Sequence, residues 1–167
     1  MSLSLTQFTR SLKVYASNYD IPSPYVLAQG AQDSNPFFEA GLGYSLYSTA
    51  AKFVKNKVSV GDILYVYDGN TFLFVTVVTG IQDEETIFTN DSISSLYNFT
   101  IYQQSAQSGL GNQGCFLMSV NDSVTIDVET LTGNTITGII LNSNDVLPIQ
   151  VRKLLTSTNG NAIYALW

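Results

Sequence analysis

The chain has 167 residues, enough for one domain or for two small ones that each bury a hydrophobic core. Charged residues make up only 12% of it, and the net charge is −6. Binding to a nucleic-acid backbone needs clustered cations. We therefore expect no nucleic-acid partner, and we interpret the closely spaced Lys52, Lys55 and Lys57 as solvated surface.

The first ten residues contain no charged stretch followed by a long apolar one, so no secretory signal is predicted and synthesis in a cytosol is expected. No apolar run approaches the roughly 18 residues that a membrane-spanning helix needs, and we expect no membrane partner. Cys115 is the only cysteine and cannot close a disulfide within the chain. Stability is therefore expected to come from packing.

Prolines at positions 22, 24 and 36 interrupt residues 1–44, and the residue before each proline is biased away from helix. This pattern predicts an irregular N-terminal arm with one short strand at 13–16. The arm is rich in aromatic side chains, which favour protein interfaces and also stack on sugars. An arm that builds no core of its own needs another surface to cover it. The expected interface residues are Tyr15, Tyr19, Tyr25, Phe37, Phe38, Tyr44, Tyr47 and Trp167.

Residues 45–57 carry apolar side chains at spacings that fit one face of a helix. These side chains are Leu46, Ala50, Phe53 and Val54. Spacings of four, three and one place them on the same side of a short amphipathic helix. We therefore predict one helix, at 45–57.

The region from residue 63 to residue 102 has the pattern of strands. The β-branched and aromatic runs 63–67 and 71–78 flank the turn Asp68-Gly69-Asn70, which predicts a hairpin. Further strands are expected at 86–89 and 97–102. Alternation in the last of these predicts that Tyr97, Phe99 and Ile101 face a core while the residues between them face outward.

The segment 105–113 is rich in Gly, Gln and Ser and is predicted to be a linker. Beyond it, five strands are expected at 116–120, 124–128, 135–141, 149–155 and 162–167. The last run ends on the only tryptophan, Trp167, and chain ends fray unless they are tied down. We therefore expect the final strand to be held in a sheet or against a neighbouring subunit.

The predicted fold class is all-β, an antiparallel sandwich or barrel with an irregular arm and one short helix. The predicted organisation is an arm at 1–44, a first β-rich part at 45–104, the linker, and a C-terminal β-rich part at 114–167.

The side chains that could carry chemistry are few. The chain has no histidine, which excludes Ser-His-Asp and Cys-His arrangements and metal sites that need imidazole. Cys115 is interpreted as a buried hydrophobic residue. Asp127 and Glu129 share a strand face at a spacing that could suit a glycosidase, but we interpret them as an exposed strand face. The acidic run 83–85 could bind Ca²⁺, but it lacks the ligand spacing of a known calcium loop and is interpreted as a solvated turn. We expect no catalytic site, no metal and no cofactor.

Several short stretches resemble structural proteins of tailed bacteriophages. In the last third these are Gly114-Cys115, Thr132-Gly133 and the segments 146–152 and 162–167; upstream they are Val60-Gly61-Asp62, the following hairpin and the strand 97–102. The resemblance implies a virion structural protein that is not an enzyme and is assembled in the host cytoplasm.

Within that class we expect a capsid decoration or cement protein. Its expected partners are further copies of itself, as a homo-oligomer with a trimer as first choice, and the major capsid protein or another virion protein. Three alternatives remain: a tail, neck or fibre-base component, a receptor- or carbohydrate-binding module, and a carboxylate-dependent glycosidase.

Overall fold

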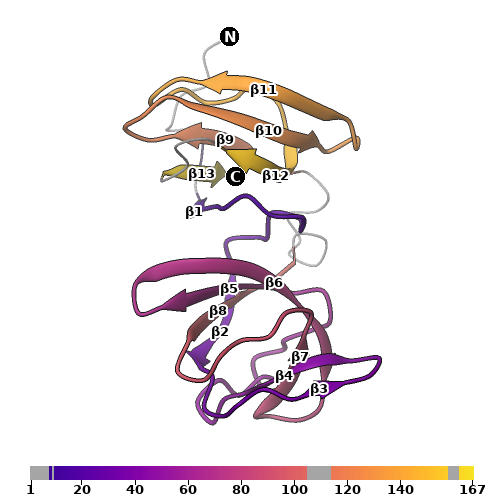
Figure 1. Cartoon of the computed structure of the whole chain (residues 1–167). Coiled ribbons are helices and arrows are strands. Elements are labelled where there is room, and N and C mark those ends of the chain that lie inside the picture. Colours follow the sequence, from indigo (N-terminus) through magenta and orange to yellow (C-terminus); the bar gives the residue numbers. More distant parts are fainter. Residues whose placement is uncertain (1–7, 9, 105–113, 158–161) are drawn as a thin grey trace. The chain divides into compact units, whose positions relative to one another are not determined.

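The computed structural model describes residue 8 and residues 10–104, 114–157 and 162–167 (Figure 1). In these residues every regular element is a β-strand and all strand pairs within the sheets are antiparallel, which confirms the all-β fold class. The chain divides into two compact units. The central unit is Tyr25–Gln104, and the terminal unit combines Met1–Pro24 with Ser105–Trp167.

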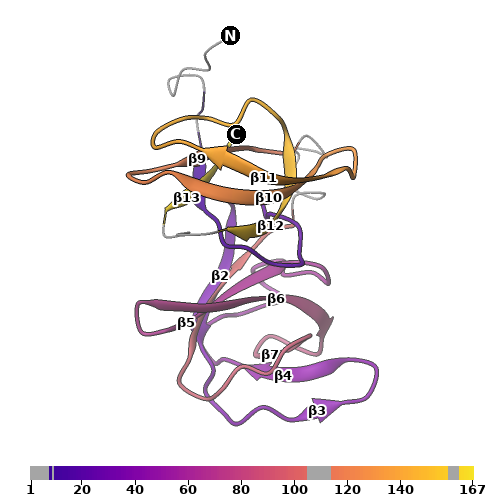
Figure 2. The same cartoon turned by 45° about the horizontal axis from the view of Figure 1, so that its top comes forward.

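The central unit is one strongly bent seven-stranded sheet (Figure 2). Its longest strand, β6, pairs through its first half with β5 and through its second half with β7. The Asp33 amide donates to the Tyr47 carbonyl at 2.9 Å, so the chain that continues β2 meets the end of β4 and the sheet approaches a closed barrel. In sheet order the strands are β2 (Val26–Ala31), β8 (Asn98–Tyr102), β5 (Ile63–Asp68), β6 (Thr71–Ile81), β7 (Thr86–Thr89), β4 (Gly43–Tyr47) and β3 (Phe38–Glu39).

The core of this unit lies on the concave side of the bent sheet. Leu46, Phe53 and Leu64 are completely buried there, and Phe99 and Ile101 of β8 face the same cluster as their alternation predicted. Burying one such side chain stabilises a fold by about 1.5–3 kcal/mol. The unit therefore has a hydrophobic core of its own.

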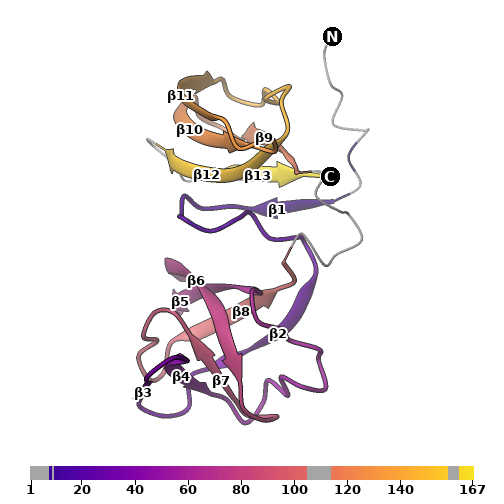
Figure 3. The same cartoon turned by 90° about the vertical axis from the view of Figure 1, so that its right-hand side faces the viewer.

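The terminal unit consists of two three-stranded sheets (Figure 3). One has the order β1-β13-β9 and the other β11-β10-β12. A bridge between Cys115 and Val151 joins the sheets, and their inner faces share a second hydrophobic core. The strands are β1 (Ser11–Lys13), β9 (Phe116–Ser119), β10 (Val124–Thr130), β11 (Thr135–Leu141), β12 (Val151–Ser157) and β13 (Ile163–Leu166).

The C-terminal strand β13 is the middle strand of its sheet. It pairs with β1 on one side and with β9 on the other, and Ile163 and Leu166 are 0% and 4% exposed. Trp167 is partly buried against the same core, and its amide donates to the Arg10 carbonyl at 3.1 Å. The terminus is thus held inside a sheet of its own chain.

The predicted helix at 45–57 is wrong. Residues Gly43–Tyr47 form β4, which pairs with β7, and turns follow. Lys52 and Lys57 have φ angles of 48° and 60°, which a right-handed helix does not allow. Of the four residues expected on the helix face, Ala50 and Val54 are exposed. The helical spacing arose because Leu46 and Phe53 enter the core from a strand and from a turn.

The division of the chain also differs from the predicted one. Residues 1–44 do not form a single arm, because Val14 and Ile21 belong to the core of the terminal unit and β2 to β4 belong to the sheet of the central unit. The Ser17 and Ile21 amides donate to carbonyls of β12 at 2.9 and 2.8 Å. The prolines prevent regular local structure in residues 17–24, but hydrogen bonds to the distant strand β12 still hold this segment against the terminal unit. The predicted linker 105–113 lies outside the described residues.

Candidate functional site: an exposed aromatic hairpin and a polar groove

The most exposed aromatic side chains of the described residues lie on the β3–β4 hairpin at the edge of the central sheet. Its turn is closed by the Leu42 amide, which donates to the Glu39 carbonyl at 3.1 Å. Gly41 and Gly43 have φ angles of +87° and +113°, which L side chains rarely adopt. At Gly43 a Cβ would also lie 2.4 Å from the Thr89 carbonyl oxygen. Glycine therefore lets the hairpin lie close against β7.

The base of the hairpin is fixed by Ser45. Its amide donates to the Phe37 carbonyl at 2.8 Å, and its side-chain Oγ accepts from the Phe37 amide at 2.9 Å. The hydroxyl of Thr79 also donates to the Leu42 carbonyl. The hairpin is consequently a fixed projection of the sheet and can present side chains in a defined geometry.

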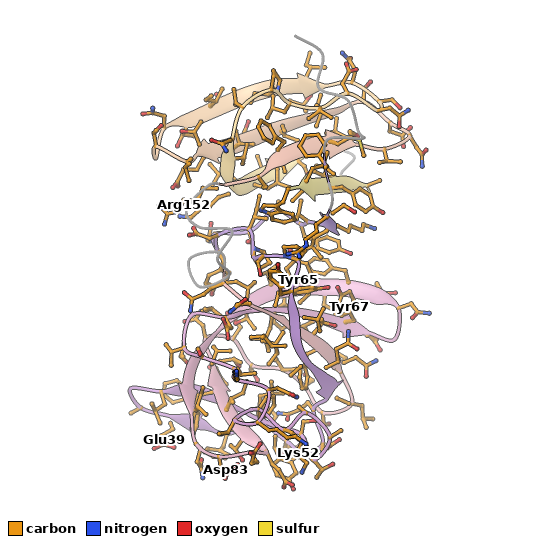
Figure 4. The ribbon with its side chains drawn as sticks, turned by 180° about the vertical axis from the view of Figure 1, so that it is seen from behind. Glu39, Lys52, Tyr65, Tyr67, Asp83 and Arg152 are labelled. Carbon is orange, nitrogen blue, oxygen red and sulfur yellow. The ribbon has the colours of Figure 1, made fainter. Side chains whose placement is uncertain are left out.

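The side chains on this hairpin are apolar and only partly covered. Phe37 and Phe38 are 55% and 64% exposed, and Leu42 of the turn is 36% exposed. The Phe37 ring meets Phe88 edge to face at 6.1 Å, and the Phe38 ring lies 5.1 Å from Tyr44. We call Phe37, Phe38 and Leu42 the hairpin surface; Glu39 extends from the same hairpin (Figure 4).

A second candidate is an open groove of about 510 Å³ across strands β2, β8 and β5 and the β5–β6 turn. We call it the polar groove. Pairing across the strands sets Tyr67 beside Asn98 and Thr100 beside Gln29. The turn adds Asn70, and all residues that line the groove are uncharged.

The tyrosine of the groove belongs to a row of aromatic rings on one face of the sheet. The Tyr67 ring lies 6.0 Å from Phe72, which lies 6.1 Å from Tyr65, and Tyr65 lies 5.0 Å from Tyr102. Tyr65 is buried, whereas Tyr67 remains partly exposed at the groove (Figure 4). Contact with Phe72 thus holds the Tyr67 ring in place.

The eight predicted interface residues are divided between the two units. Phe38 and Tyr44 face each other across the hairpin, and Phe37 lies at its base opposite Ser45. Tyr47 is tied to Glu85, whose carboxylate accepts from its hydroxyl at 3.1 Å and raises the pKa of the phenol. Tyr25 lies next to β8, since its carbonyl accepts from the Gln103 amide at 2.9 Å. The remaining three, Tyr15, Tyr19 and Trp167, belong to the terminal unit and are partly buried.

The carboxylates considered for chemistry have structural partners. The Asp127 carboxylate accepts from the Gly138 amide at 2.8 Å, at an irregularity in the β10–β11 pairing. Glu129 lies 3.4 Å from Lys153 and 3.7 Å from Arg152, and both cations also reach Asp20. This four-membered network ties the chain before Ile21 to β12. Surface pairs of this kind contribute about 0–1 kcal/mol each.

The acidic run 83–85 is a capped turn. The Asp83 carboxylate accepts from the amides of Glu85 and Thr86, both at 2.8 Å, and Glu85 pairs with Lys52 at 3.1 Å. In the part of the chain that the structure describes, no group of three His, Cys, Asp or Glu side chains is placed to hold a metal ion. Burial raises the pKa of the Cys115 thiol, so the reactive thiolate is disfavoured.

No helix within the described ranges is long and apolar enough to cross a membrane.

No sequence pattern indicates that the groove residues lie together. Asn98 and Thr100 were placed on the outward face of their strand by alternation, but β2, which carries Gln29, was not predicted as a strand. Alternation alone gives no sign of which strands lie side by side. Gln29 therefore could not be placed beside Thr100 from the sequence.

Comparisons with protein-family models, with curated proteins and with solved structures find no match to this chain. Function is therefore inferred from the two surfaces and from the resemblance of the sequence.

Proposed function

We propose that this chain is a non-enzymatic structural protein of a tailed-phage particle, attached to the head as a decoration or cement protein by protein–protein contacts. The observation that supports this most is the hairpin surface. Phe37 and Phe38 are both more than half exposed on a rigid hairpin. Exposed aromatic side chains of this kind commonly act as anchors that become buried at the centre of a protein–protein interface. The phage assignment itself rests on the resemblance of the sequence.

The hairpin surface suits a partner protein better than water. Exposed apolar groups that gather in one place mark interaction sites, whereas single ones are ordinary. Phe37 and Phe38 are neighbours in an extended segment, so their rings point to opposite faces of the hairpin, toward Phe88 and Tyr44, and the apolar surface wraps around the hairpin. The rings are already held by Tyr44 and Phe88, so a partner would order few further side chains on binding.

The chain as a whole is suited to dense packing with copies of itself or of a shell protein. Only 12% of its residues are charged, which weakens the mutual repulsion that keeps molecules apart. We propose that it self-associates, with a trimer as first choice. Light scattering at micromolar concentration tests this, and a mass of only 18.2 kDa would contradict it.

The location in the particle can be tested directly. Quantitative mass spectrometry of purified particles, from the phage that encodes this chain, is expected to find many copies in proportion to the major shell protein. A few copies arranged in a ring would instead favour the tail, neck or fibre-base alternative. Absence from the particles would refute a virion role.

Attachment through the hairpin can be tested with two variants. Phe38→Ser removes the more exposed ring, and Ala40→Arg adds a long charged side chain to the turn without removing a packing contact. Both are expected to bind weakly to particles that lack the protein, measured by co-sedimentation, while the melting temperature stays close to that of the wild type.

The matched control is Val54→Ser, which replaces an apolar residue that is 52% exposed in the same unit but outside the hairpin. It is expected to bind as the wild type does. If both hairpin variants also bind as the wild type does, attachment uses another surface.

A further inference from the structure

The attachment role makes no use of the polar groove. We propose that this groove binds a neutral oligosaccharide. The inference goes beyond the proposed function and does not depend on it, because the groove residues and the hairpin surface share no side chain.

The chemistry of the lining favours hydroxyl-rich ligands. Gln29, Asn70 and Asn98 present amide groups, each with two donors and an acceptor, and Thr100 adds a hydroxyl. A sugar hydroxyl also donates and accepts, so it can satisfy both parts of an amide at once. Three amides and a hydroxyl around one groove supply both the donors and the acceptors that a ring of hydroxyls requires.

The ring of Tyr67 supplies the apolar contact. A tyrosine combines a flat apolar face with a polar end, and so suits a ligand that is itself apolar on one face and polar at its edge. Because Phe72 meets this ring at 6.0 Å, its position is largely set before a ligand arrives. Little side-chain entropy would be lost on binding.

The absence of charge argues against other ligands. All residues that line the groove are uncharged, so a phosphate or a carboxylate would find no cation to offset its desolvation. An added peptide strand needs the unpaired backbone of a sheet edge. The groove lies mainly on β8 and β5, which have neighbours on each side, and it reaches the edge strand β2 only through Gln29 and Gly30. Acidic glycans, nucleotides and β-strand peptides are therefore disfavoured.

The size and position of the groove favour a segment of a longer glycan. Its volume of about 510 Å³ falls within the range of about 300–1,000 Å³ that is usual for small-ligand sites, but it is open along the sheet. Most of its side chains come from β2, β8 and β5, and groups on strands hold their geometry better than groups on loops. An open, rigid groove can hold a few sugar units of a chain that continues in both directions.

The test uses the full chain on an array of neutral oligosaccharides of glucose, galactose, mannose and N-acetylglucosamine, with acidic glycans and extended peptides alongside. Any neutral glycan retained is then titrated by calorimetry and by amide NMR shifts. We expect a dissociation constant of about 1 mM or lower, with the largest shifts at Asn98, Thr100 and Gln29.

Two variants test whether the glycan binds in the groove. Tyr67→Ala removes the ring, and Asn98→Asp removes a donor and adds a charge at an exposed position that is unimportant for packing. Each is expected to weaken binding about tenfold or more, by analogy with other truncated anchor residues. Tyr67→Phe is expected to keep most of the affinity, because the ring remains.

The control is Tyr44→Ala, which removes a partly buried ring of the same unit outside the groove. It is expected to leave glycan binding unchanged. The proposal is overturned if no neutral glycan binds, if acidic glycans or peptides bind better, or if binding persists in both groove variants. Attachment of these variants to particles is measured separately, so failure of this proposal is distinguishable from failure of the attachment role.

Discussion

Gln32 is a polar residue that the core of the central unit depends on. It is completely buried, and its amide nitrogen donates to the carbonyls of Ser45 and Ile93 at 3.1 and 3.4 Å. Its Oε1 accepts from the Tyr47 amide at 2.7 Å. One side chain thereby joins the end of β2 to β4 and to the segment before β8.

Replacing Gln32 with leucine is expected to destabilise the protein. The change leaves two buried carbonyls and one partly buried amide without their partner, and each buried unsatisfied group costs about 1–3 kcal/mol. We expect a loss of about 2–4 kcal/mol in the free energy of unfolding, measured with urea. Gln29→Leu, at an exposed position of the preceding strand β2, should change it by less than about 0.5 kcal/mol. Equal losses in both variants would contradict this role.

Asp62 gives the central unit a pH dependence. It is completely buried, and its carboxylate accepts from the amides of Ser59 and Gln104 at 2.7 and 2.9 Å. Burial raises its pKa and the two hydrogen bonds lower it, with burial the larger effect. The folded state therefore holds this proton more tightly than the unfolded state.

The contribution of Asp62 to stability is expected to fall as the pH rises. Because its pKa is raised on folding, the folded chain binds more protons from about pH 4, the unfolded pKa, up to the folded pKa. The stabilisation that Asp62 contributes decreases between the unfolded pKa and the folded pKa, and it no longer changes with pH above the folded pKa. The free energy of unfolding of the wild type minus that of Asp62→Asn should decline with pH in urea titrations. A difference that grows with pH would mean that the hydrogen bonds outweigh burial.

At the scale of elements, the β3–β4 hairpin depends on two glycines that differ in one respect. Both have positive φ angles, but only Gly43 lies against another strand, since a Cβ at Gly41 would meet nothing within 4 Å. Substitution at Gly41 therefore introduces backbone strain alone, whereas substitution at Gly43 introduces backbone strain and a steric clash.

Gly43→Ala is expected to cost more stability than Gly41→Ala. At Gly41 the only cost of the alanine is its left-handed backbone conformation, which lowers the free energy of unfolding by about 1 kcal/mol. At Gly43 the new Cβ would also clash with a backbone oxygen of β7, and we expect a loss of about 2–4 kcal/mol. Urea unfolding compares the two, and hydrogen exchange at the β4 amides shows whether the hairpin detaches. Equal losses would indicate that the hairpin moves away from β7 without penalty.

The strands after residue 60 were predicted from the sequence more successfully than those before it, for a physical reason. The strands predicted downstream of residue 60 are all present within one to three residues of their expected bounds, because alternation of apolar and polar residues reports a sheet with one buried face. β2, β3 and β4 were missed. β3 has only two residues, β2 contains Gly30, and the apolar spacing of β4 and the following turns imitates a helix.

At the scale of the whole molecule, the two units have separate cores, and both chain ends belong to the same unit. The N-terminal β1 pairs with the C-terminal β13. The central unit is therefore an insertion between two parts of the terminal unit, and its residues are continuous in sequence.

Deleting residues 162–167 is expected to unfold the terminal unit alone. The deletion removes the middle strand of a sheet and the buried Ile163 and Leu166, and losing a large buried side chain costs about 2–5 kcal/mol. Against a typical stability of about 5–15 kcal/mol the unit should not remain folded. Hydrogen exchange should then show protection at β5, β6 and β8 and none at β10 and β12. Protection retained in both units would show that β13 is dispensable.

Composition and local periodicity indicate an all-β protein and the position of most strands, and they predict a C-terminal run that is held in a sheet or against a neighbouring subunit. These properties follow from local periodicity and composition, which each segment carries independently of the rest. Only the folded chain shows which strands are neighbours and that residues 11–21 join the terminal unit. It also shows that Tyr67, Asn98 and Gln29 share one groove. Such contacts join residues far apart in sequence, and only packing and hydrogen bonding across the whole chain select them.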